Sequence, residues 1–141
     1  MTTRSELRGQ CLCGAVRLTA IPTSLHVDAC HCQMCRRWGG GPMMVVECNR
    51  NLSFEGQQYI VLFGSSEWAE RGFCRQCGTH LFFRLKDLSY CAVPVGLFEG
   101  STAWSFTQQV FIEQKPAYYS FSEKTENLTG EELFAKHSQG S

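Results

Sequence analysis

The sequence lacks an excess of charge of either sign, and it lacks any long hydrophobic run. Its 141 residues include 13 Lys plus Arg and 13 Asp plus Glu, so the formal net charge is zero. Because non-specific nucleic-acid binding needs a basic face, no nucleic-acid partner is expected. No apolar run approaches the roughly 18 residues of a membrane span, and the opening MTTRSELRGQ lacks the apolar centre of a signal peptide. These absences predict no membrane partner and a cytoplasmic location.

Linkers, internal repeats and low-complexity segments are also absent from the sequence. Without a break in composition, one domain is expected over residues 1–141, a length typical of single domains. Hydrophobic residues make up 43% of the chain and aromatic residues 12%. This content is enough to build a core and argues against disorder.

Short runs of apolar and β-branched residues alternate with Gly, Pro, Asn and Ser clusters, which predicts a mainly β fold. The clearest helix signal lies near the end, where Thr129 and Glu132 have the spacing of a capping box. A short turn of helix is also compatible with the residues after Cys35. We therefore expect a mostly antiparallel β domain with a short C-terminal helix. The predicted strands are 15–20, 42–47, 58–63, 79–85, 90–95 and 109–114.

Cysteine is the residue that the sequence has in abundance. Nine cysteines are compatible with the disulfides of small secreted domains or with bound metal ions. The number is odd, no secretion signal is present, and most of the cysteines fall in tight clusters. Metal binding is therefore the favoured interpretation.

One candidate zinc site combines two short cysteine motifs. Cys74 and Cys77 form a Cys-x-x-Cys-Gly turn, in which the glycine lets backbone N–H groups approach the sulfurs. Such a turn is half of a tetrahedral zinc site, and Cys11 and Cys13 are the candidates for the other half. The 60 residues from 14 to 73 separate the two motifs, so the metal would fasten the start of the chain to a mid-chain hairpin. Closed by four thiolates, this site would be structural.

A second candidate site lies in a single loop, CHCQMC, which contains Cys30, Cys32 and Cys35. Three protein ligands with one open position are typical of a catalytic or exchangeable zinc ion. Three thiolates give the zinc complex a net charge of about −1, so it is less suited to ionising water than to holding an added thiolate. The pattern therefore favours chemistry on a small thiol, with these three cysteines as the catalytic residues.

Alternative interpretations stay open for both sites. A fourth ligand from Cys48, Cys91 or a histidine would close the second site and make it purely structural. Its three thiols are also compatible with an iron–sulfur cluster, although such clusters usually need four cysteines. Cys74 and Cys77 could form a redox pair, but the matching Cys-x-Cys-Gly motif favours metal.

Several polar residues flank these motifs. His31 lies between two candidate ligands, so its ring is expected to point away from the metal, towards a backbone or solvent partner. His80 begins an apolar strand and is expected to be a strand-end histidine rather than a site residue. Arg36 and Arg37 are compatible with binding a ligand carboxylate, although such a pair more often forms a solvated turn.

The motifs GQCLCGAVRL, CHCQMCRRWGGGP and RGFCRQCGTHLFF, together with the closing FIEQKPAYYSF, resemble one known family. This is the glutathione-dependent formaldehyde-activating enzyme (GFA) family, to which centromere protein V is related. The resemblance runs from about Gly9 to Tyr119. It implies a β-tent of short antiparallel sheets stapled by zinc. It also implies a structural zinc on Cys11, Cys13, Cys74 and Cys77, and a second, catalytic zinc on Cys30, Cys32 and Cys35.

The resemblance further implies a carbon–sulfur lyase that forms S-hydroxymethylglutathione from formaldehyde and glutathione, so a small thiol is the expected partner. The alternative is a non-catalytic zinc protein that binds or carries glutathione or contacts a protein partner. A third hypothesis, a thiol redox protein, would need Cys48 or Cys91 to be a reactive nucleophile. An uncovered edge strand would favour a homodimer.

Overall fold

The computed structural model describes residues 5–139, with side chains as far as Lys136, and divides the chain into two compact units. The first unit combines Met1–Leu25 with Val45–Ala103, and the second combines His26–Met44 with Trp104–Ser141. The predicted domain over 1–141 includes residues 1–4 and 140–141, which lie outside the described part of the chain. A single domain therefore stays a prediction, and each unit is described by itself.

The first unit contains a three-stranded antiparallel sheet in the order β1-β2-β5. Its strands are β1 (Leu7–Gln10), β2 (Arg17–Ala20) and β5 (Leu52–Glu55). Leu18 and Ala20 of β2 are buried, because alternate side chains of a strand point to the same face. The predicted strand 15–20 is thus confirmed from residue 17 onward.

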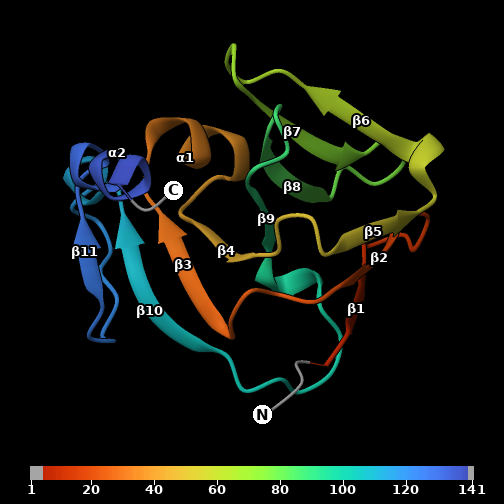
Figure 1. Cartoon of the computed structure of the whole chain (residues 1–141), viewed down its shortest axis with the longest axis horizontal. Coiled ribbons are helices and arrows are strands. Elements are labelled where there is room, and N and C mark those ends of the chain that lie inside the picture. Colours follow the sequence, from red (N-terminus) through yellow and green to blue (C-terminus); the bar gives the residue numbers. More distant parts are fainter. Residues whose placement is uncertain (1–4, 140–141) are drawn as a thin grey trace. The chain divides into compact units, whose positions relative to one another are not determined.

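The first unit also contains an antiparallel ladder in the order β4-β9-β8-β7-β6 (Figure 1). Leu81 and Phe82 of the central strand β8 are both buried, which explains the continuous apolar run predicted as a strand. The predicted strands 42–47, 58–63, 79–85 and 90–95 are confirmed, except that 3-10 turns occupy Gln57–Tyr59 before β6 and Val95–Leu97 after β9. The strands are β4 (Met43–Glu47, in this unit from Val45), β6 (Ile60–Phe63), β7 (Ala69–Cys74), β8 (His80–Leu85) and β9 (Cys91–Pro94).

Gly72 lets β7 lie directly against the ring of Phe82 in the neighbouring strand. A Cβ atom at Gly72 would lie 2.4 Å from Cζ of Phe82. Phe82 is 1% exposed, so its ring has little room to shift. The glycine is therefore needed for packing, although it interrupts the apolar pattern of its own strand.

The second unit is built around three parallel strands in the order β11-β10-β3 (Figure 1). These strands are β3 (His26–Cys30), β10 (Ser105–Val110) and β11 (Glu126–Leu128). The antiparallel arrangement of the first unit therefore does not extend to the second. The helices α1 (Gln33–Gly39) and α2 (Gly130–Gln139) complete it.

The predicted strand 109–114 is correct only as far as Val110. Phe111 has a φ of 54°, and residues Ile112–Gln114 form a 3-10 turn instead of extended chain. The ring of Phe111 packs edge-to-face on Phe134 of α2, with centroids 5.8 Å apart. It also fills the space beside Gly130, where a Cβ atom would lie 2.4 Å from Cε1 of the ring. Packing against the helix thus overrides the local strand propensity.

The capping box predicted for the C-terminal helix is present. The Thr129 hydroxyl accepts the Glu132 N–H at 3.1 Å, and the Glu132 carboxylate accepts the Thr129 N–H at 2.9 Å. The predicted helical turn after Cys35 is also confirmed, as part of α1.

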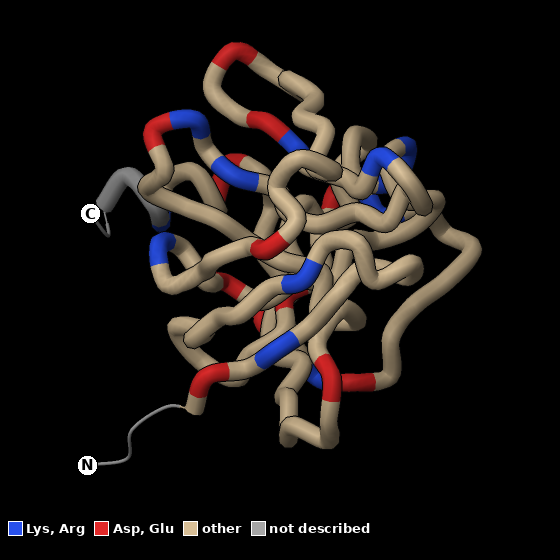
Figure 2. Tube along the Cα trace, turned by 90° about the vertical axis from the view of Figure 1, so that its right-hand side faces the viewer, with Lys and Arg blue, Asp and Glu red and all other residues tan. Residues whose placement is uncertain are grey.

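Charged residues of both signs are interspersed along the trace (Figure 2). Ion pairs join Arg84 to Glu70 at 2.7 Å and Lys136 to Glu126 at 3.3 Å. Within the described part of the chain, the helices are too short or too polar to cross a membrane.

Candidate metal centres

The four-cysteine group consists of Cys11, Cys13, Cys74 and Cys77, all in the first unit. Their four Sγ atoms lie within 4.8 Å of one another. The two motifs are separated by 60 residues of sequence and were predicted to share one metal, and the fold brings their sulfurs together. Cys11 and Cys13 lie in the turn after β1, whereas Cys74 ends β7 and Cys77 lies in the turn that leads to β8.

The two turns have the same local design. Gly14 and Gly78 both have a φ of 79°, a conformation that glycine adopts without steric cost. The Gly14 N–H donates to the Cys11 carbonyl at 3.1 Å, and the Gly78 N–H donates to the Cys74 carbonyl at 2.8 Å. Each glycine thus closes a tight turn that directs its two cysteine side chains to one point.

The sulfur separations fit a tetrahedral zinc ion. The Sγ atoms of Cys11 and Cys13 are 3.6 Å apart, and those of Cys13 and Cys74 are 3.8 Å apart. Zn–S bonds of about 2.3 Å in a tetrahedron place neighbouring sulfurs about 3.8 Å apart. A donor set of four thiols at this spacing could therefore hold a metal ion.

Thr79 supports this group and was missed by sequence reasoning. Its hydroxyl accepts the Leu12 N–H at 3.0 Å and lies 3.1 Å from the Sγ atom of Cys77. Since the oxygen already accepts from Leu12, the hydroxyl proton is placed to be donated to the sulfur. The Thr79 hydroxyl is the main factor that lowers the pKa of the Cys77 thiol to about 5. The Val16 N–H adds a similar contact to Cys11, at 3.4 Å.

The three-cysteine group consists of Cys30, Cys32 and Cys35, all in the second unit. Cys30 ends β3, Cys32 is the N-cap of α1, and Cys35 lies in the first turn of that helix. The Sγ atom of Cys32 accepts the Cys35 N–H at 3.3 Å, as a capping residue should. The three Sγ atoms lie within 4.8 Å of one another, and no further His, Cys, Asp or Glu among the described residues joins them. The thioether sulfur of Met43 lies 4.0 Å from the Sγ atom of Cys35.

The crowding of these thiols opposes their ionisation. The neighbouring sulfurs of Cys32 and Cys35, and then burial, raise the pKa of the Cys30 thiol far above its usual value. A cation among the three sulfurs would remove this penalty, because it would favour the thiolates. The donor set therefore fits a thiophilic metal ion such as zinc.

His31 lies between two of these cysteines and is fully buried. Its Nε2 atom is 2.7 Å from Oε1 of Gln109, and its Nδ1 atom is 2.5 Å from the hydroxyl of Tyr119. Gln109 in turn donates from Nε2 to the Thr125 hydroxyl at 2.9 Å, and that hydroxyl donates to Asn127 at 2.6 Å. The partners of the ring are thus side chains, where a backbone or solvent partner was expected.

The donors and acceptors in this chain of hydrogen bonds determine which nitrogen of the His31 ring carries the proton. Because Gln109 directs its NH₂ group to Thr125, its carbonyl oxygen faces the ring and accepts the Nε2 proton. Burial lowers the pKa of His31 by more than the hydrogen bond to Gln109 raises it, which favours the neutral ring. Nδ1 then accepts the Tyr119 hydroxyl proton. The network locks the segment between Cys30 and Cys32 in one orientation.

Two further contacts hold the three-cysteine loop. The Arg36 Nε atom donates to the His31 carbonyl at 3.0 Å, and the Gln114 side chain accepts the Gln33 N–H at 2.8 Å. Arg36 thus serves the loop backbone, whereas Arg37 is exposed.

A model of the glutathione-dependent formaldehyde-activating enzyme family matches residues 6–114, most of the chain. The chain belongs to the GFA family. A curated relative from Schizosaccharomyces pombe, described as an uncharacterized lyase, is 36% identical over 129 residues, which cover 91% of this chain and 94% of the relative. A crystal structure of a Rhodobacter sphaeroides protein matches 68% of this chain and 91% of its own, with a TM-score of 0.59 and 24% identity. At that identity the structural match supports the fold alone.

The other candidate residues of this GFA chain lie outside both cysteine groups. Cys48 and Cys91 are buried in the first unit, and burial raises their pKa values to about 12 and about 11. Neither is therefore suited to act as the low-pKa nucleophile that a redox protein would need. His80 begins β8 as expected, and burial is the first factor that lowers its pKa.

Proposed function

We propose that this chain is a zinc-dependent carbon–sulfur lyase of the GFA type. Its substrates would be glutathione or another small thiol, together with formaldehyde or a related aldehyde. The observation that carries the proposal is the convergence of Cys30, Cys32 and Cys35 without a fourth Cys, His, Asp or Glu among the described residues. Membership of the GFA family and a relative described as a lyase support the same reaction class.

The chain's own residues would supply binding and orientation. Cys30, Cys32 and Cys35 would hold the zinc ion, which would favour the thiolate form of the substrate thiol. As the carbon–sulfur bond forms, the proton released by the thiol would end on the aldehyde oxygen. His31 is not placed to exchange a proton with the substrate, because Gln109 and Tyr119 occupy both of its ring nitrogens. Its role would be to keep Cys30 and Cys32 directed to one point, so that proximity provides most of the acceleration.

The four-cysteine group would hold a second zinc ion with a structural role. Four thiol donors leave no position for a substrate, so we assign no chemistry to it. A small thiol would be the partner in a cytoplasmic setting. A homodimer could form at β6, the last strand of its ladder, which exposes Leu62 and Phe63.

The test is the rate of S-hydroxymethylglutathione formation, measured by exchange NMR against the uncatalysed reaction of glutathione with formaldehyde. Cys32→Ala should abolish the acceleration and reduce the zinc content from two ions to one in native mass spectrometry. Cys48→Ala, which changes a buried cysteine outside both groups, is the matched control and should leave both values unchanged.

Two outcomes would contradict the proposal. If the wild-type protein gives no acceleration but binds glutathione saturably, the non-catalytic binding protein becomes the better interpretation. If Cys32→Ala retains the full rate, the three-cysteine group is not the site of reaction.

A further inference from the structure

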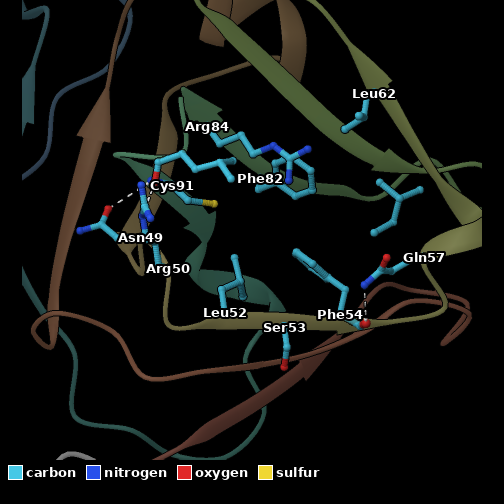
Figure 3. Close-up of a pocket in the computed structure, with 12 residues that line it drawn as sticks. Asn49, Arg50, Leu52, Ser53, Phe54, Gln57, Leu62, Phe82, Arg84 and Cys91 are labelled. Atoms are coloured by element: carbon cyan, nitrogen blue, oxygen red, sulfur yellow. Dashed lines mark hydrogen bonds between the residues drawn. The ribbon is translucent and has the colours of Figure 1, made fainter. Parts of the chain in front are cut away.

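We propose that the first unit carries a second ligand site, a pocket for a small organic anion with an apolar body. A cavity of about 490 Å³ opens between β5, β6, β8 and β9 (Figure 3). This volume falls within the range of roughly 300–1,000 Å³ that is usual for small-molecule sites. None of the seven cysteines of the two metal groups lines it. The pocket therefore shares no residue with either cysteine group.

The charged residues that line the cavity are all positive. Arg50 and Arg84 both line the cavity, and no Asp or Glu does. Glu70, the partner of Arg84, lies outside the lining. The wall of the pocket thus presents two guanidinium groups and no carboxylate, and only Arg84 has a carboxylate partner, through its Nε atom.

Both arginines are held through the same atom, Nε. Arg84 donates from Nε to Glu70 at 2.7 Å, and Arg50 donates from Nε to the Leu88 carbonyl at 3.3 Å. No hydrogen bond joins their terminal Nη nitrogens to the described residues, so the outer edge of each fork is available to a ligand. This edge matches the two oxygens of a carboxylate.

An aromatic surface holds the Arg84 guanidinium in place and also provides the apolar wall. The Arg84 guanidinium lies 4.6 Å from the centroid of Phe82, and the Phe82 and Phe54 rings are 5.5 Å apart. Stacking and the Nε bond together restrict the guanidinium before any ligand binds, which lowers the entropic cost of binding. Ile60 and Leu62 continue the apolar wall from β6.

The polar neighbours contribute less. Asn49 uses both ends of its amide within the protein, since Nδ2 donates to Glu47 at 2.7 Å and Oδ1 accepts the Cys91 N–H at 3.2 Å. Gln57 donates to the Phe54 carbonyl at 3.3 Å. The Ser53 side chain points away from the other lining side chains (Figure 3). The main groups left to recognise a ligand are thus two guanidinium groups and an apolar wall. This combination selects an aryl or alkyl carboxylate over a neutral or polar molecule.

The experiment is an NMR titration of the zinc-loaded, full-length protein with 4-phenylbutyrate, alongside its neutral analogue 4-phenylbutanol. We expect shifts confined to cavity residues with the carboxylate, and binding at least about tenfold weaker for the alcohol. Arg50→Met and Arg84→Met should each weaken binding of the carboxylate by about tenfold. Arg17→Met, at an exposed arginine on β2 outside the lining, is the matched control and should change nothing.

Arg84→Met removes the ion-pair partner of Glu70 and could disturb the fold. Arg50 is exposed, so Arg50→Met should fold normally and tests the site by itself. Equal binding of the acid and the alcohol would overturn the assignment to anions. The absence of shifts at cavity residues, or binding that Arg50→Met leaves unchanged, would overturn the site itself. None of these outcomes depends on lyase activity.

Discussion

Replacing Gln109 by Leu should show whether the His31 network holds the three-cysteine group in place. Leu has a similar volume but cannot accept a hydrogen bond, so the Nε2 proton of His31 would lose its partner. His31 is fully buried and Gln109 is 6% exposed, so water cannot readily replace the lost amide. An unsatisfied buried donor costs about 1–3 kcal/mol.

This cost has two measurable consequences. For a chain of this length, about 1–3 kcal/mol corresponds to a decrease in Tm of roughly 3–9 °C. Loss of an outer-shell partner also weakens metal affinity, typically by about 10–100-fold, because the ligands are less well oriented. The affinity loss should be confined to the three-cysteine group, since Gln109 and His31 make their contacts in the second unit.

Thermal unfolding at a fixed free zinc concentration, combined with zinc competition against a chelator, measures both effects. The zinc concentration must be fixed because bound metal stabilises the folded state by mass action. Thr125→Val is the matched control: it removes the next link of the network, but Thr125 is only half-buried, so water can take its place. The network would have no positioning role if Gln109→Leu matched Thr125→Val in both Tm and zinc affinity.

Three further predictions concern packing, capping and thiol reactivity. Gly72→Ala should destabilise the protein by about 1–3 kcal/mol in thermal unfolding, because its Cβ would overlap the buried Phe82 ring; an unchanged Tm would show that the ring can move. Thr129→Ala should cost α2 about 1 kcal/mol, seen as faster amide exchange in that helix only. Burial raises the pKa of Cys48 and Cys91, so both stay protonated near neutral pH and should react slowly with iodoacetamide, with a rate that rises towards the pKa values of about 12 and about 11. Fast alkylation of either thiol at neutral pH would revive the redox hypothesis.

Most of the strands that the sequence predicted contain a continuous apolar run, and β7 was missed because it has none. β7 (Ala69–Cys74) contains Arg71 and Gly72 between its apolar residues, so it has no strand pattern of its own. Yet Arg71 is 2% exposed and its guanidinium lies 5.1 Å from the Phe83 ring of the adjacent strand. Cross-strand packing supplies what the local pattern lacks, and a single sequence does not record it.

The parallel pairing of the second unit was hidden for a related reason. β3 and β10 are separated in the chain by 74 residues, from 31 to 104, so no hairpin signal connects them. Parallel strands need a long crossover, whereas antiparallel neighbours are often revealed by a short turn. The sequence therefore indicated the β character of this unit but not its topology.

The metal ligands and the residues that hold them in place also differ in how far the sequence could predict them. Cysteine ligands were predictable because Cys-x-Cys and Cys-x-x-Cys spacings bring two donors together through local backbone geometry. Thr79 could have been found, since it follows Cys77 by two residues and carries a hydroxyl. Gln109 and Tyr119 could not, because they reach His31 across 78 and 88 residues of sequence. The cysteine spacing therefore predicts that a metal binds, whereas its affinity and the openness of its fourth position depend on residues that only the fold brings together.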